Sequence, residues 1–227
     1  EINIDGDIKL VVSDNITSTQ ANVLDGYTTG QVTATISTTA IADLDDLTGT
    51  GNAYTITVAD SQVTAAALNT VNAATSVNVT ATAVTQITGS AAELATTYAG
   101  GITGLGNETI VLTDTSLAAA TLTPTVNGYS TVAINANSVT TLTGTNAEIV
   151  AAYAADTAAT VIIDTDAKLT VSGTITSTEA NTLDAFTTGV VTASISTTAI
   201  ADLDDLTGTG NAYTITVGDS QVTAAAL

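Results

Sequence analysis

Residues 28–68 read TTGQVTATISTTAIADLDDLTGTGNAYTITVADSQVTAAAL, and residues 187–227 read TTGVVTASISTTAIADLDDLTGTGNAYTITVGDSQVTAAAL. The two stretches lie 159 positions apart and differ only at the pairs Gln31/Val190, Thr35/Ser194 and Ala59/Gly218. A modular strut gains length with each faithful copy, whereas a catalytic domain has no physical reason to be copied so closely. The repeat therefore predicts one continuous solenoid over residues 1–227, cut from a longer array. A 159-residue module, residues 1–159, is followed by a partial second copy, residues 160–227.

The composition leaves most enzyme chemistry without its usual side chains. The chain has no Cys, His, Met or Trp, and Lys and Arg together number two. Acid–base catalysis near neutral pH, thiol or imidazole metal ligation and cationic binding of phosphate rely on those residues. We therefore expect that the protein is not an enzyme.

The net charge of -20 bears on partners and on location. Such a charge repels nucleic acid and anionic membrane surfaces. No apolar run reaches the roughly 18 residues of a spanning helix, so no membrane insertion is expected from this segment. A chain this acidic is typical of secreted and surface-exposed material, and the predicted location is extracellular or the cell surface. The absence of Cys leaves the redox compartment undetermined.

A shorter repeat lies inside the module, in which an alternating apolar strand precedes a small-residue segment with helical spacing. Strands are predicted to open at Ile2, Val32, Tyr54, Val77, Ile110, Val132, Val161, Val191 and Tyr213. In YTITV, residues 54–58, the apolar side chains fall on one face and the two threonines on the other. One strand per unit requires parallel pairing and a right-handed crossover. The predicted fold is an α/β repeat solenoid with one strand per coil and short helices on the return; the alternative is an all-β right-handed β-solenoid.

Helix starts are predicted in phase with these strands. A hydroxyl residue is followed three positions later by Gln or Glu in Thr17–Gln20, Ser90–Glu93, Thr145–Glu148 and Thr176–Glu179. This pattern satisfies backbone amides that the first helical turn leaves unpaired. In the segments that follow, Leu or Ile precedes an aromatic residue by three or four positions, which predicts a buried stripe. The aromatic residues are Tyr27, Tyr98, Tyr153 and Phe186.

The units resemble leucine-rich repeats. VAINANSVTTLTGTNAEIVAAYA, residues 132–154, is similar to the strand, Asn turn and second half-coil of that family, with Asn137 at the turn. ITVADSQVTAAAL, residues 56–68, is similar to the shorter bacterial version, with Asp60 in that place. The resemblance implies an architecture, although Val, Ile and Ala mostly replace Leu. The whole chain also resembles the Thr- and Ala-rich tandem arrays of large secreted bacterial adhesins and surface-layer proteins.

Two kinds of binding site can be proposed from residue type. Outward strand positions carry Thr33, Thr35, Thr55, Thr57, Thr80, Thr82, Thr214 and Thr216. Such ladders resemble the ice-binding face of antifreeze proteins, so a Thr-face module for ice or polysaccharide is the alternative function. Calcium takes carboxylate ligands from turns, and stacked coils would bring successive acids together. The candidate metal ligands are Asp5, Asp7, Asp43, Asp45, Asp46, Asp164 and Asp166, with the ADLDDL acids recurring at Asp202, Asp204 and Asp205.

ADLDDL also has a purely structural interpretation. It can form a solvated helical face, with Leu44 and Leu47 packing inward in the first copy and Leu203 and Leu206 in the second. The function predicted from all these features is structural: an extracellular rod, fibre, surface layer or adhesin stalk. Its predicted partner is itself, joined end to end or laterally, and calcium is the candidate cofactor.

Overall fold

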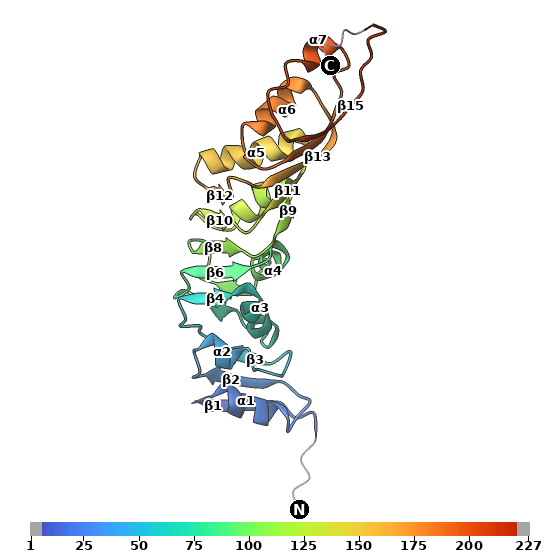
Figure 1. Cartoon of the computed structure of the whole chain (residues 1–227). Helices are drawn as coiled ribbons and strands as arrows, with labels where there is room; N and C mark the ends of the chain where they lie inside the picture. Colours follow the sequence, from blue (N-terminus) through green and yellow to red (C-terminus); the bar gives the residue numbers. More distant parts are fainter. Residues whose placement is uncertain (1–5, 222–227) are drawn as a thin grey trace, which may run out of the picture. The chain divides into compact units, whose positions relative to one another are not determined.

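The computed structural model describes residues 6–221, which form parallel β-sheets and short helices (Figure 1). They divide into two compact bodies. The N-terminal body comprises Glu1–Val111 with Tyr129–Val132, and the C-terminal body comprises Leu112–Gly128 with Ala133–Leu227. The predicted α/β class is confirmed, and seven α-helices among the described residues rule out the all-β alternative. The strand opening predicted at Ile2 and the candidate ligand Asp5 lie outside the described residues.

The N-terminal body contains three groups of neighbouring strands. Its strands are β1 (Leu10–Ile16), β2 (Val32–Ile36), β3 (Ala53–Thr55), β4 (Gln62–Thr64), β5 (Val79–Thr80), β6 (Gln86–Gly89), β7 (Ile102–Thr103) and β8 (Thr109–Leu112). The orders are β1-β2-β3, β4-β6-β8 and β5-β7. Its helices are α1 (Ser18–Asp25), α2 (Ile41–Leu44), α3 (Ala65–Ala73) and α4 (Ala91–Thr97).

The C-terminal body repeats this construction. Its strands are β9 (Ser116–Ala118), β10 (Ile134–Ala136), β11 (Thr141–Gly144), β12 (Val161–Ile163), β13 (Lys168–Ile175), β14 (Val191–Ile195) and β15 (Ala212–Ile215). One sheet has the order β15-β14-β13-β11-β9, and β10 pairs with β12. Its helices are η1 (Thr121–Thr125), η2 (Val126–Gly128), α5 (Asn146–Thr157), α6 (Ser177–Asp184) and α7 (Ile200–Leu203). Strand pairings in each body, such as β1 with β2 and β13 with β14, are parallel.

All four predicted capping boxes are present. Thr17, Ser90, Thr145 and Thr176 begin α1, α4, α5 and α6, and each pair of reciprocal bonds is made. At Ser90 the backbone amide and the hydroxyl donate to the Glu93 carboxylate, and these bonds lower the pKa of Glu93. The helix starts were predictable because each cap joins residues only three positions apart.

The expectation of one strand per unit is wrong for most of the described chain. Two strands separate α2 from α3, α3 from α4 and α5 from α6, and three strands separate α4 from η1. A tight turn divides β5 from β6, closed by the bond from the Val84 amide to the Ala81 carbonyl. Val84 and Ala81 are both buried, so the chain turns a corner of the core and begins a second strand instead of a helix.

Alternation within the strands follows the prediction in the first copy of the repeat. Tyr54, Ile56 and Val58 are at most 1% exposed, whereas Thr55 and Thr57 face solvent. The ADLDDL leucines also pack inward, with Leu44 fully buried. No helix in residues 6–221 is both long enough and apolar enough to cross a bilayer.

The same YTITV sequence is exposed in the second copy. Ile215 is 42% exposed and Val217 is 38% exposed, although Ile56 and Val58, 159 positions earlier, are fully buried. In the first copy the next repeat unit lies against this strand, because the Val58 amide donates to the Thr80 carbonyl at 2.8 Å. The first copy of this strand is therefore buried by its contact with the unit that follows it.

Candidate functional site: hydroxyl contacts between successive repeat units

A threonine hydroxyl ties the second repeat unit to the first. Thr28 Oγ1 donates to the Ile8 carbonyl at 2.6 Å, and the Thr29 amide donates to the Gly6 carbonyl at 2.7 Å. The Gly30 amide donates back to Thr28 Oγ1 at 2.9 Å. We call this three-bond arrangement a hydroxyl staple. A buried hydroxyl suits it because one oxygen both donates to a carbonyl and accepts from an amide.

The second copy of the repeat makes the same staple. Thr187 Oγ1 donates to the Ala167 carbonyl at 2.7 Å, and the Thr188 amide donates to the Thr165 carbonyl at 2.8 Å. The Gly189 amide donates to Thr187 Oγ1 at 2.9 Å. Each bond matches its counterpart in the first copy to within 0.1 Å.

Two further staples occur inside the N-terminal body. Thr75 Oγ1 donates to the Tyr54 carbonyl at 2.7 Å and accepts from the Val77 amide at 3.1 Å. Ser130 Oγ donates to the Glu108 carbonyl at 2.6 Å and accepts from the Val132 amide at 3.0 Å. The four hydroxyls reach carbonyls 20 to 22 residues earlier, which is about the length of one repeat unit. Each of these four staples therefore joins one unit to its predecessor.

A buried asparagine provides a second contact between units. Asn52 is 1% exposed; its Nδ2 donates to Asp25 at 2.8 Å and its Oδ1 accepts from the Val32 amide at 2.8 Å. The second copy repeats both bonds through Asn211, Asp184 and the Val191 amide. Side-chain amides that bond in both directions fix the register of the strands they connect.

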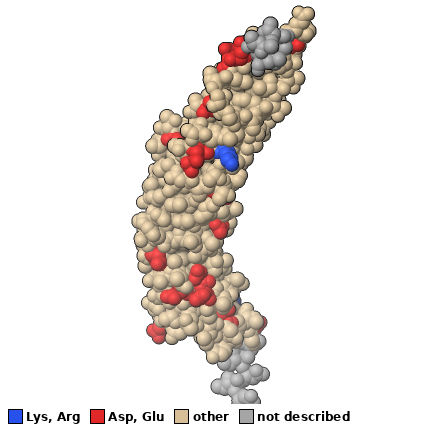
Figure 2. Space-filling model, in the orientation of Figure 1, with Lys and Arg blue, Asp and Glu red and all other residues tan. Residues whose placement is uncertain are grey.

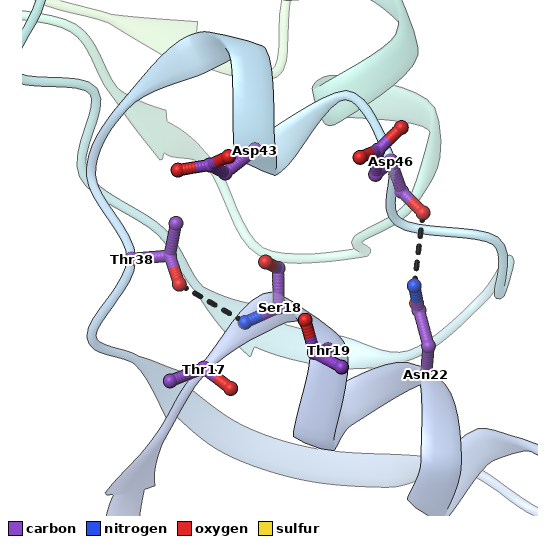
Figure 3. Close-up of a pocket in the computed structure, with 7 residues that line it drawn as sticks. All are labelled: Thr17, Ser18, Thr19, Asn22, Thr38, Asp43 and Asp46. Carbon is purple, nitrogen blue, oxygen red and sulfur yellow. Dashed lines mark hydrogen bonds between the residues drawn. The ribbon is translucent and has the colours of Figure 1, made fainter.

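An open depression of about 580 Å³ lies between α1 and α2. The Ser18 amide donates to Thr38 Oγ1 at 3.0 Å, and Asn22 Nδ2 donates to the Asp46 carbonyl at 2.9 Å. Asn22 Oδ1 also accepts from the Thr48 amide. Figure 3 shows the lining from α1 and its cap, Thr17, Ser18, Thr19 and Asn22, opposite Thr38, Asp43 and Asp46.

The lining residues of this depression recur in the sequence 159 positions later with every residue type retained. The Ser177 amide donates to Thr197 Oγ1 at 3.2 Å, and Asn181 Nδ2 donates to the Asp205 carbonyl at 2.8 Å. In both copies the polar groups are used to hold α1 or α6 against the next unit. The arrangement supplies hydrogen bonds between units and two exposed carboxylates.

The candidate calcium ligands do not converge. Within residues 6–221 no group of three or more carboxylate, His or Cys side chains could hold a metal ion. Asp43 and Asp46 line the α1–α2 depression, Asp45 ends α2, and Asp7 is exposed. Asp164 accepts from the Asp166 amide in its own turn. Figure 2 shows the acidic side chains in small separate patches on a mostly uncharged surface. Calcium binding stays a prediction.

Some predicted outward threonines line up across strands. Thr35 pairs with Thr55 between β2 and β3, and Thr57 pairs with Thr80 at an isolated bridge. Thr35, Thr55 and Thr57 are exposed, and Thr80 is half-buried. These rows are short, and the ice or polysaccharide alternative stays a prediction.

Glu108 is a buried residue that was not predicted from the sequence. It is 0% exposed and accepts bonds from the Tyr98 hydroxyl, the Gly106 amide at 2.8 Å and the Asn107 amide at 3.0 Å. Tyr98 stacks on Tyr129 with ring centroids 4.6 Å apart. Donors on both carboxylate oxygens make the burial of this charge tolerable. Its carboxylate joins the glycine-rich loop to Tyr98 at the end of α4.

The staples were also not predicted, although the sequence carried a signal for them. Thr28-Thr29-Gly30 recurs as Thr187-Thr188-Gly189, and Thr75 and Ser130 occupy the same place in their own units. Gly30 and Gly189 would ordinarily be interpreted as helix stops or turns. Neither has a positive φ, and a Cβ on Gly30 would lie 2.3 Å from the Asp7 carbonyl oxygen. These glycines are required by close backbone approach.

Burial raises the pKa of Tyr54 and Tyr153. It raises the pKa of the Tyr54 phenol to about 12, and the charge of Asp25 acts in the same direction. Burial likewise raises the pKa of Tyr153 to about 12. A free tyrosine ionises near pH 10, so between these values the unfolded chain loses protons that the folded chain keeps.

We therefore expect stability to be complete below about pH 10 and to fall as pH rises through about 12. Tyr54→Phe should move the alkaline unfolding midpoint upward, because the Tyr54 hydroxyl is buried without a hydrogen-bond partner. Unfolding is followed by circular dichroism against pH. Tyr27→Phe is the control, since Tyr27 is 74% exposed. Equal midpoints for all three chains would contradict the expectation.

A family-model scan and searches of curated proteins and solved structures found no match to this chain.

Proposed function

We propose that the chain is a structural segment of an extracellular tandem-repeat assembly: a rod, fibre, surface layer or adhesin stalk. In this proposal the repeat units stack as an α/β solenoid, and added copies of the module add length. One observation carries the proposal: bonds that join a unit to its neighbour occur again, between equivalent residues, 159 positions later. Both the hydroxyl staples and the asparagine contacts take part in it.

The use of polar residues supports this function. Hydroxyl and amide side chains that in a binding protein would face a ligand are here bonded to the backbone of a neighbouring unit. Thr85, Ser138, Thr140 and Ser196 add further bonds of this kind, each to a carbonyl 21 to 26 residues earlier. Each such bond contributes about 1 kcal/mol. Stability therefore accumulates with the number of units, as a stalk requires.

The dependence of burial on the following unit also supports it. The strand that contains Ile56 is buried where the next unit lies on it, and the Val58 amide donates to the Thr80 carbonyl of that unit. A repeat unit of this kind buries its apolar face only when a neighbouring unit packs against it. The acidic composition is in keeping with a location outside the cell.

Small-angle scattering tests the proposal with chains lengthened by whole modules. Each module contains about six units, and strands stack at about 4.8 Å, so each added module should extend the maximum dimension by about 29 Å. The cross-sectional radius should stay constant. The control is the 227-residue chain measured at the same mass concentration. A cross-section that grows with module number would contradict stacking along one axis, because a compact domain grows in every direction.

A further inference from the structure

The outer side of β1 and α1 in the N-terminal body is apolar and exposed. We call it the β1–α1 face. Tyr27 is 74% exposed and Ile8 is 44% exposed; Val11 and Val23 are exposed as well, but their equivalents Thr170 and Thr182 stay exposed in the second copy. An open depression of about 270 Å³ on this face is lined by Ile16, Thr19, Gln20, Val23 and Leu24. Within the described residues β1 is an outer strand, paired only with β2.

The equivalent side of the C-terminal body is covered. Residues 167–186 correspond to residues 8–27 at the 159-residue spacing. Leu169 and Leu183 are fully buried there, whereas their equivalents Leu10 and Leu24 are half-buried. The structure therefore contains equivalent positions twice, fully buried at Leu169 and Leu183 and only half-buried at Leu10 and Leu24.

Helix α5 and strand β11 form the cover. Tyr153 of α5 stacks on Phe186 with ring centroids 4.8 Å apart. Asn146, at the start of α5, donates to Glu179 at 2.9 Å, and α5 lies against α6 (Figure 1). Strand β11 pairs in parallel with β13, with Leu142 opposite Leu169.

Each group that receives the cover has an equivalent on the β1–α1 face. Tyr27 corresponds to Phe186, Leu10 to Leu169, and the amide of Gln20 to the carboxylate of Glu179. Gln20 offers an oxygen acceptor, as Glu179 does. The free edge of β1 corresponds to the edge of β13 that β11 occupies.

We propose that the β1–α1 face is the docking surface for residues 133–159 of another copy of the module in the same chain. This inference rests on the proposed function and identifies the contact through which modules join. In the joined state Tyr27 stacks on Tyr153 of the preceding copy, and β11 of that copy extends the sheet from β1. A copy in the same chain fits because residue 160 corresponds to residue 1, so the linkage is identical. A second molecule is a poorer source, since its own residues 167–186 already cover this segment.

Tryptophan fluorescence tests the docking, because the chain contains no Trp. Tyr27→Trp is introduced into the full chain and into a chain with an added copy of residues 133–159 before residue 1. In the lengthened chain we expect emission at shorter wavelength and several-fold weaker quenching by acrylamide. Phe186→Trp is the matched control, because its site is already covered by α5 and should not respond to the added copy.

A second lengthened chain carries Ile149→Ser and Tyr153→Ser in the added copy only. The indole introduced by Tyr27→Trp should stay as exposed in this chain as in the chain without the added copy. Amide exchange of β1 in the lengthened chain without the serine substitutions gives an independent readout, with protection expected on docking.

Two outcomes would overturn the proposal. One is an indole at position 27 that stays exposed beside a folded added helix. The other is protection of the β1 amides from exchange in the original 227-residue chain that increases with protein concentration. That result would assign the face to a second molecule. If the maximum dimension still increases with each added module while this indole stays exposed, the proposed docking contact is wrong but the proposed structural function is retained.

Discussion

A methyl group on Gly189 is expected to lower the free energy of unfolding by about 3 kcal/mol. The Cβ of Gly189→Ala would lie 2.2 Å from the Asp166 carbonyl oxygen and 2.7 Å from that of Ala167. Both are backbone atoms, so no side chain can rotate away. The bond from Thr187 Oγ1 to the Ala167 carbonyl holds the two backbone segments together, so they cannot easily move apart to relieve the clash.

Urea unfolding followed by circular dichroism measures this loss. Gly26→Ala is the control, because its Cβ would meet only ordinary contacts at 3.5 Å and its φ is -66°. That change should stay within about 0.5 kcal/mol of the parent chain. In Gly30→Ala the new Cβ would lie 2.3 Å from the Asp7 carbonyl oxygen, a similar clash. The segment around Asp7 is exposed to solvent, so this change should lower the free energy of unfolding less than Gly189→Ala does. A loss at Gly189 no larger than that at Gly26 would show that close backbone approach is not what requires glycine.

Loss of the Asn52 side chain should cost about 3 kcal/mol, because Asn52→Ala removes two bonds and leaves buried partners without replacements. The Asp25 carboxylate loses its amide donor, and the Val32 amide loses its acceptor. Asn211→Ala removes the same two bonds in the second copy. Asn211 is half-buried, so water can replace part of what is lost and the cost should be about 1 kcal/mol.

The isosteric change Asn52→Asp separates hydrogen bonding from packing. It keeps the volume but places a second carboxylate against Asp25 at the present 2.8 Å contact. Two carboxylates at that distance cannot both ionise cheaply, so the variant should be least stable at neutral pH and recover as the pair takes up a proton in acid. Denaturation curves at neutral and acidic pH measure this. A penalty independent of pH, or equal losses for the Asn52 and Asn211 variants, would contradict the burial argument.

Local features of the fold were predictable from residue order. The four capping boxes were correct because Thr17 and Gln20, like their equivalents, meet within a single turn. The alternation of Tyr54, Ile56 and Val58 was also correct, since strand geometry alone sends successive side chains to opposite faces. The start of α2 was not predictable in this way. Its first amide, that of Ile41, is capped by Asp60 at 2.7 Å, from the following repeat unit.

The environment of each aromatic residue was predicted less well. Tyr27 was assigned to a buried stripe with Tyr98, Tyr153 and Phe186, and Tyr153 is 5% exposed while Tyr27 is 74% exposed. Tyr153 of α5 stacks on Phe186 of α6, whereas Tyr27 is open to solvent in the described structure. Among the described residues the candidate aspartates do not converge, for a related reason. Whether two acids meet depends on the register in which units lie against each other, and spacing along the chain does not determine that register.

By itself, the sequence determined that this protein is built from repeated strand and helix units, where most of its helices begin, and which strand positions face a core. These properties follow from bonds and periodicities that span a few residues. Only the tertiary structure decided which hydroxyls become staples, why Gly30 and Gly189 have no side chain, and which identical strands are buried or exposed. Those outcomes depend on contacts between residues 20 or more positions apart. Such contacts form only when one unit packs against the next.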